Sequence, residues 1–114
     1  MPCIQLTVSQ KLTEQNKVTI KSRLGQAIQI LPGKSESWLM VIIHDDACMY
    51  FKGNQNAPMA FADVSVYGNE NGNAFNNLTM AICDILNEEI GTPADRIYVK
   101  YSATQHWGWN GGNF

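Results

Sequence analysis

Residues Met1-Pro2-Cys3-Ile4-Gln5-Leu6-Thr7-Val8 form the first strand that the sequence predicts, and the fold follows from it. The state of Met1 decides what Pro2 can do. If Met1 is removed, the Pro2 nitrogen is a secondary amine, which can serve as a general base or nucleophile. If Met1 is retained, that nitrogen is an amide without a proton, and Pro2 only begins an edge strand.

A helix is expected after this strand. Thr13 is its predicted N-cap, with Glu14 in an acidic first turn, and Pro32-Gly33 ends it. The apolar residues of this segment recur at helical spacing and comprise Ile20, Leu24, Ala27, Ile28 and Leu31. Residues 38–43 are apolar at both parities, which predicts a strand covered on both faces. A short strand is expected at residues 49–51.

The second half of the chain repeats this order. Residues 59–67 predict a strand with Phe61 and Val64 in the core, and residues 68–73 form a loop. The next helix has an apolar stripe and ends at Gly91 and Pro93. The residues of the stripe are Phe75, Leu78, Ile82, Ile85, Leu86 and Ile90. Residues 97–101 predict another strand, before an aromatic, glycine-rich tail at 107–114.

The repeated strand–helix–strand order predicts an α/β fold within a single domain, residues 1–114. Its pseudo-repeats cover about residues 2–46 and 58–103. Two βαβ units with right-handed crossovers give a four-stranded mixed sheet with both helices on one face. The helices cover only one face of this sheet, and strands that are apolar on both sides would expose apolar side chains on the opposite face. We therefore expect oligomerisation with sheets facing one another.

Composition excludes several classes of function. A net charge of -2 gives no basic surface, so we expect no nucleic-acid partner. The longest apolar run is too short to span a bilayer, and the N-terminus lacks the pattern of a signal peptide, so a cytoplasmic protein is expected. Cys3, Cys48 and Cys83 contain no C-x-x-C pair, which disfavours a disulfide scaffold or zinc site. Cys48 and Cys83 are expected as buried apolar residues.

Four segments occur in an order typical of a known family. They are Met1-Pro2 at the start of a strand, Gly33-Lys34 after the first helix, residues 93–98 (Pro-Ala-Asp-Arg-Ile-Tyr) after the second, and the tail from Gly108-Trp109-Asn110 to Phe114. Together they resemble the macrophage migration inhibitory factor branch of the tautomerase superfamily, over essentially the whole chain. The resemblance implies a homotrimer with an active site at each subunit interface, and no metal or cofactor.

The resemblance also implies roles for individual residues. Pro2 is the expected catalytic base in keto–enol tautomerisation of phenylpyruvate-like α-keto acids, and dopachrome is a further candidate substrate. Lys34 binds the substrate carboxylate and disfavours protonation of Pro2, and Tyr98 is a hydroxyl donor from the neighbouring subunit. The aromatic rim of the pocket corresponds to Trp38, Trp109 and Phe114.

Three positions depart from the family pattern. Lys100 replaces an asparagine, and as a second cation near the pocket it would favour acidic substrates. Tyr67 stands at the pocket floor in place of isoleucine, and Trp107 adds bulk near the rim. Without the resemblance, Lys34 reads as a solvated helix-end lysine and Tyr98 as a half-buried strand tyrosine. Similarly, Lys100 could point to solvent and Tyr67 could pack elsewhere.

Two other functions remain open at this point. One is a signalling mimic that binds a host receptor, retains weak or vestigial tautomerase activity, and is released without a signal peptide. The other is a trimeric module that binds small acids without turning them over. His44 and His106 are isolated histidines without triad or metal spacing, and we expect them to be structural or surface residues.

Overall fold

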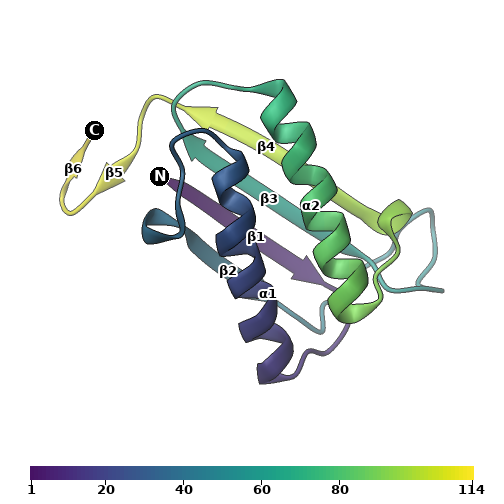
Figure 1. Cartoon of the computed structure of the whole chain (residues 1–114). Helices are drawn as coiled ribbons and strands as arrows, with labels where there is room; N and C mark the ends of the chain where they lie inside the picture. Colours follow the sequence, from purple (N-terminus) through teal and green to yellow (C-terminus); the bar gives the residue numbers. More distant parts are fainter.

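The computed structural model describes all 114 residues, Met1–Phe114. Two long helices, α1 (Glu14–Ala27) and α2 (Gly72–Ile90), lie side by side on one face of a single sheet (Figure 1). The strands of the sheet are β1 (Pro2–Val8), β2 (Met40–His44), β3 (Ala60–Tyr67) and β4 (Ile97–Thr104). A tail hairpin, β5 (Gly108–Trp109) with β6 (Gly112–Asn113), extends past the end of the sheet where the chain begins.

The strand order β2-β1-β3-β4 confirms the mixed four-stranded sheet. Within each βαβ unit the two strands pair in parallel, β1 with β2 and β3 with β4. The two units meet through β1 and β3, which are antiparallel. This meeting places Pro2 opposite Val66, so the start of β1 lies beside the end of β3.

The ends of both helices follow their sequence signals. Thr13 caps α1 with a capping box, in which its hydroxyl accepts from the Asn16 N–H and the Asn16 side chain accepts from the Thr13 N–H. Gly91 ends α2 in the left-handed conformation at φ 71°. The last turn of the first helical segment, Ile28–Ile30, is a 3₁₀-helix, so the α-helix stops earlier than expected.

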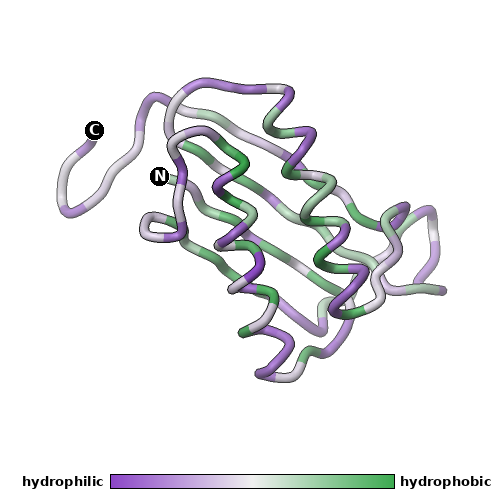
Figure 2. The backbone as a smooth tube through the Cα atoms, in the orientation of Figure 1, coloured by the Kyte–Doolittle hydropathy of each residue, from purple (hydrophilic) through white to green (hydrophobic).

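The core lies between the sheet and the helices. Alternate residues of the two central strands face α1 and α2 and are buried, and Figure 2 shows hydrophobic and hydrophilic stretches alternating along both helices. The fully buried side chains of the core include Ile4, Leu6, Ile20, Leu24, Leu78, Ile82 and Leu86. The apolar stripes of both helices are thus largely confirmed. None of the helices combines the length and the hydrophobicity that spanning a membrane requires.

Two segments differ from the sequence prediction. Trp38 and Leu39 do not belong to a strand, because Glu36–Trp38 form a 3₁₀-turn closed by the Leu39 N–H bonding to the Glu36 carbonyl at 3.1 Å. Residues 49–51 likewise form no strand. They end in an isolated bridge between Phe51 and Asn54, around a turn that Gly53 makes at φ 81°.

The uncovered face of the sheet is mixed rather than apolar. Phe61 lies on this face and not in the core, because β3 alternates and buries its even-numbered residues. Asp63 and Ser65 share the face with Phe61, while β2 is a partly exposed edge strand. Cys48 is exposed, contrary to expectation, because it lies in the loop that follows β2.

Candidate functional site

A groove of about 740 Å³ opens at the end of the sheet where β1 begins. Three parts of the chain form it: the first residues, the link from the 3₁₀-turn into β2, and the tail. The side chains that line it include Pro2, Cys3, Trp38, Met40, Trp107 and Trp109. Pro2 itself is less than 2% exposed. The groove therefore brings the two ends of the sequence to the same place.

Met1 connects this groove to a lysine. The Tyr67 N–H donates to the Met1 carbonyl at 2.9 Å, and the Lys34 Nζ donates to the Tyr67 carbonyl at 2.8 Å. Burial, and then the nearby Lys34 ammonium, lower the pKa of the Met1 amine below its ordinary value. The structure thus places a cation and the chain's amine side by side.

The turn after α1 explains the position of Lys34. Gly33 adopts the left-handed conformation at φ 75°, which reverses the chain, and the Lys34 N–H bonds back to the Leu31 carbonyl at 3.0 Å. A solvated helix-end lysine, the alternative in the sequence analysis, would not have its ammonium group bonded to the end of a strand. Lys34 is instead half-buried between the end of α1 and the end of β3.

A smaller cavity of about 230 Å³ adjoins Lys34 and Tyr67. Leu31, Val66 and Phe75 supply apolar walls, so the cavity lies between the end of α1, the end of β3 and the start of α2. Tyr67 therefore belongs to this cavity and not to the lining of the larger groove. Met1 lines the groove and accepts a hydrogen bond from Tyr67, which lines the smaller cavity, so the two spaces are connected through this bond.

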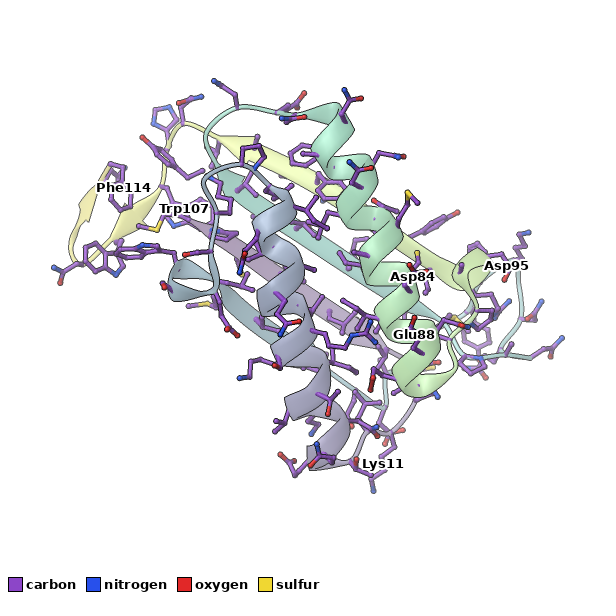
Figure 3. All side chains as sticks on the ribbon, viewed as in Figure 1. Lys11, Asp84, Glu88, Asp95, Trp107 and Phe114 are labelled. Carbon is purple, nitrogen blue, oxygen red and sulfur yellow. The ribbon has the colours of Figure 1, made fainter.

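Aromatic side chains from distant parts of the sequence form a cluster beside the groove. The Trp38 and Trp109 rings meet edge to face, with centroids 5.1 Å apart. The Trp109 and Phe114 rings are parallel at 6.2 Å, and Phe114 also contacts Tyr67 at 5.5 Å. The tail hairpin is closed by the Phe114 N–H bonding to the Trp107 carbonyl at 3.0 Å, and Figure 3 labels both residues at this end. The expected rim residues are thus brought together.

Tyr98 lies far from Pro2 within the chain. It pairs with Phe61 in β3, which in turn pairs with Thr7 in β1. Thr7 is five residues beyond Pro2, a distance of roughly 16 Å along a strand. The Tyr98 side chain is 65% exposed, so it is available to a molecule other than its own chain.

Lys100 is also outside the groove of its own chain. Its Nζ lies 3.6 Å from Asp63 Oδ2, and both side chains project from the uncovered face of the sheet. An aspartate at this distance offsets the lysine charge. A role for Lys100 at a pocket would therefore have to be in another subunit.

Sequence reasoning assigned no site role to Cys3 or His106, yet both line the groove. Cys3 follows Pro2, and this adjacency was the only signal. Burial and Asp63 raise the pKa of the Cys3 thiol, so it stays protonated and weakly nucleophilic at neutral pH. His106 is exposed, as expected, and only the folding of the tail brings it to the groove. No group of three or more His, Cys, Asp or Glu side chains could hold a metal ion.

Known proteins match this arrangement over nearly the whole chain. The family model of macrophage migration inhibitory factor matches residues 1–114. The macrophage migration inhibitory factor of Xenopus laevis is 30% identical over 98 residues, and the match covers 84% of this chain and 84% of its own. The crystal structure of MIF2 from Leishmania major has a TM-score of 0.92 at 34% identity and covers 100% of this chain and 97% of its own. A homologue from Prochlorococcus marinus has a TM-score of 0.88 at 25% identity, with 98% of both chains covered.

Proposed function

The chain belongs to the macrophage migration inhibitory factor family within the tautomerase superfamily, and we propose that it is a keto–enol tautomerase. The proposed substrates are phenylpyruvate-like α-keto acids, with dopachrome as a second candidate. Pro2 is the proposed general base, once Met1 has been removed. The observation that carries the proposal is the Lys34 ammonium beside the amine end of β1.

The reaction moves one proton from the carbon beside the carbonyl and returns one across the enol. The base must be neutral near pH 7, so its conjugate acid must give up its proton there. Burial and a neighbouring cation both disfavour a protonated amine. Both causes act on the Met1 amine in this structure, and Pro2 is more deeply buried than Met1. We expect burial and the Lys34 ammonium to lower the pKa of a free Pro2 amine as well.

Removal of Met1 would also create a binding site for a carboxylate. The Tyr67 N–H loses its acceptor when the Met1 carbonyl leaves, and the Lys34 ammonium is no longer beside the Met1 amine. A substrate carboxylate is a natural replacement, since backbone N–H and lysine donors both bind anions. The larger groove, with Trp38 and Trp109, would then receive the aromatic part of the substrate.

A homotrimer completes the proposed site. Tyr98 cannot reach the groove of its own chain, but its exposed hydroxyl can serve a neighbouring subunit. The uncovered sheet face and the mixed polar residues on it suit an inner surface shared by several copies. The proposed pocket therefore combines Pro2 and Lys34 of one subunit with Tyr98 of another.

The decisive experiment compares three proteins in a phenylpyruvate enol–keto assay at neutral pH: the Met1-free protein, a Met1-retaining protein confirmed by intact mass, and Pro2→Gly. We expect the last two to lose turnover by about 10²- to 10⁴-fold, the usual contribution of a general base. Pro58→Gly, in the half-buried loop before β3, is the matched control and should retain activity. Undiminished turnover in Pro2→Gly with an intact trimer would refute the assignment.

A binding module without turnover is distinguished by titration. In that case the Pro2 amine has an ordinary pKa, which leaves no neutral base at pH 7. A titration of the amine by NMR in the Met1-free protein measures this directly. A lowered pKa supports the enzyme, and an ordinary one supports the binding module.

The family name of the relatives, a factor that inhibits macrophage migration, motivates a second proposal, that of a signalling mimic that binds a host receptor. This function requires the folded trimer but not turnover. Receptor binding by the folded Pro2→Gly trimer at physiological concentration would support this second proposal. If neither the wild type nor Pro2→Gly binds a receptor at micromolar levels, the proposal is refuted. We propose separately that the protein is cytoplasmic and is released without a signal peptide.

A further inference from the structure

The loop between β2 and β3 places an aromatic ring against Tyr98. The Phe51 and Tyr98 rings meet edge to face, with centroids 5.0 Å apart and an angle of 80° between their planes. Phe51 does not belong to the hydrophobic core, although it is only partly exposed. The Phe51 ring therefore contacts Tyr98, at the end of the sheet away from Pro2, and does not pack between the sheet and the helices.

Arg96 fixes the loop that carries Phe51. Its Nε donates to the Ala57 carbonyl and its Nη2 donates to the Asn54 carbonyl, both at 3.2 Å. The guanidinium also lies 5.6 Å from the centroid of the Phe51 ring, a cation–π distance. Phe51 and Asn54 exchange two backbone hydrogen bonds, at 3.0 and 3.1 Å. The ring is thus held by its own backbone and by a residue that precedes Tyr98 by two positions.

We propose that Phe51 is a positioning residue for Tyr98, which it orients for the groove of a neighbouring subunit. This inference rests on the proposed function, in which Tyr98 donates its hydroxyl to a bound substrate. Tyr98 is 65% exposed, and an exposed strand side chain is otherwise free to change rotamer. An edge-to-face contact restricts that freedom before the substrate arrives, which lowers the entropic cost of aligning the hydroxyl.

The test is a double-mutant cycle on kcat and KM. Phe51→Leu removes the ring and keeps an apolar side chain, and we expect kcat/KM to fall about three- to tenfold, the usual scale of one aromatic pair. Phe51→Tyr restores an aromatic ring and should restore activity. In a Tyr98→Phe background, Phe51→Leu should have almost no further effect, because the hydroxyl that it positions is already absent.

Tyr50→Leu is the matched control. Tyr50 precedes Phe51 in the same loop, is 68% exposed, and has no aromatic partner in the chain. This control should leave kcat/KM unchanged, and all variants should keep the trimer. NMR of labelled tyrosine supplies a readout independent of turnover: Tyr98 resonances should shift in Phe51→Leu and not in Tyr50→Leu.

The outcomes separate this assignment from the proposed function. If the Met1-free wild type has no turnover, the proposed function fails and this assignment fails with it. If the wild type is active and Phe51→Leu matches it, only the positioning role is overturned. An equal loss from Phe51→Leu in both the wild-type and Tyr98→Phe backgrounds also overturns it, because Phe51 would then act without the hydroxyl.

Discussion

The two ends of the sheet hold different halves of the proposed pocket. At one end, Pro2 lies in a groove that the tail lines with aromatic rings, and Lys34 lies in the adjoining smaller cavity, bonded to Tyr67. At the other end, Tyr98 projects from the start of β4 and is more than half exposed. The antiparallel pairing of β1 with β3 keeps these ends apart in one chain. If the proposed pocket includes Tyr98, a second copy of the chain must therefore supply it.

Lys34 and Lys100 differ in burial and in the charge partner of each ammonium group. Lys34 is half-buried, and its ammonium hydrogen-bonds to a backbone carbonyl beside the chain's amine. Lys100 has a side chain that is 60% exposed, and Asp63 offsets its charge. A cation affects nearby groups more strongly when it is shielded from water and has no carboxylate partner. We therefore expect Lys34, and not Lys100, to lower the pKa of the N-terminal amine.

Lys34→Gln should have the largest effect on this comparison. Glutamine cannot make the charge-assisted hydrogen bond that the Lys34 ammonium is proposed to donate to the substrate carboxylate. Loss of this bond should lower kcat/KM about 100-fold. Lys34 lowers the pKa of the Met1 amine, and we expect it to act in the same way on the Pro2 amine of the Met1-free protein. Its removal should therefore raise the pKa of the Pro2 amine and move the acidic limb of the pH–rate profile to higher pH. Steady-state kinetics from pH 5 to about 9 measure both effects. A reduced rate with an unmoved limb would show that Lys34 binds substrate only.

Subunit complementation tests whether the two ends meet between chains. Tyr98→Phe alone should lower kcat/KM about tenfold, the value of one hydrogen bond to a charged group. Co-expression of Pro2→Gly and Tyr98→Phe chains should give mixed trimers in which about a quarter of the sites pair an intact Pro2 with an intact Tyr98.

The co-expressed protein should therefore be about five times more active than an equal mixture of the two variants purified separately. The measurement is turnover per subunit, with trimer content checked by light scattering. No gain on co-expression would place Tyr98 outside the pocket of the neighbouring subunit.

Trp109→Leu should weaken the aromatic side of the groove. Trp109 contacts both Trp38 and Phe114, and an aromatic pair contributes about 0.5–1.5 kcal/mol beyond its buried area. We expect KM for phenylpyruvate to rise about three- to tenfold with little change in kcat. The Tm should stay close to wild type because the tail lies outside the core. An unchanged KM would mean that the substrate ring binds elsewhere.

Lys100→Gln should have the smallest effect. Its pair with Asp63 is exposed, and such pairs contribute about 0–1 kcal/mol to stability. We expect kcat/KM to change by less than about threefold, with unfolding in urea shifted only slightly. A loss as large as that of Lys34→Gln would instead establish Lys100 as a second cation in a neighbouring pocket, as its departure from the family pattern suggests.

Several features could be read directly from the sequence. Local signals fixed both helices, because Thr13 and Gly91 are residues whose side chain or conformational freedom suits a helix end. The duplicated order predicted the mixed sheet. Trp38 was misassigned to a strand, since an apolar run cannot reveal that a 3₁₀-turn precedes β2. Phe61 was misassigned to the core because alternation shows two faces without telling which one the helices cover.

The sequence by itself determined the two long helices, the order of the main strands and the family, because these depend on local spacing and on motifs in a fixed order. Tertiary structure decided which residues meet. Only the pairing of β1 with β3 puts Met1 beside Tyr67 and Lys34, and only the fold of the tail brings Trp109 to Trp38. Contacts between residues far apart in the chain depend on strand order and loop path, which the local pattern of a single segment does not give.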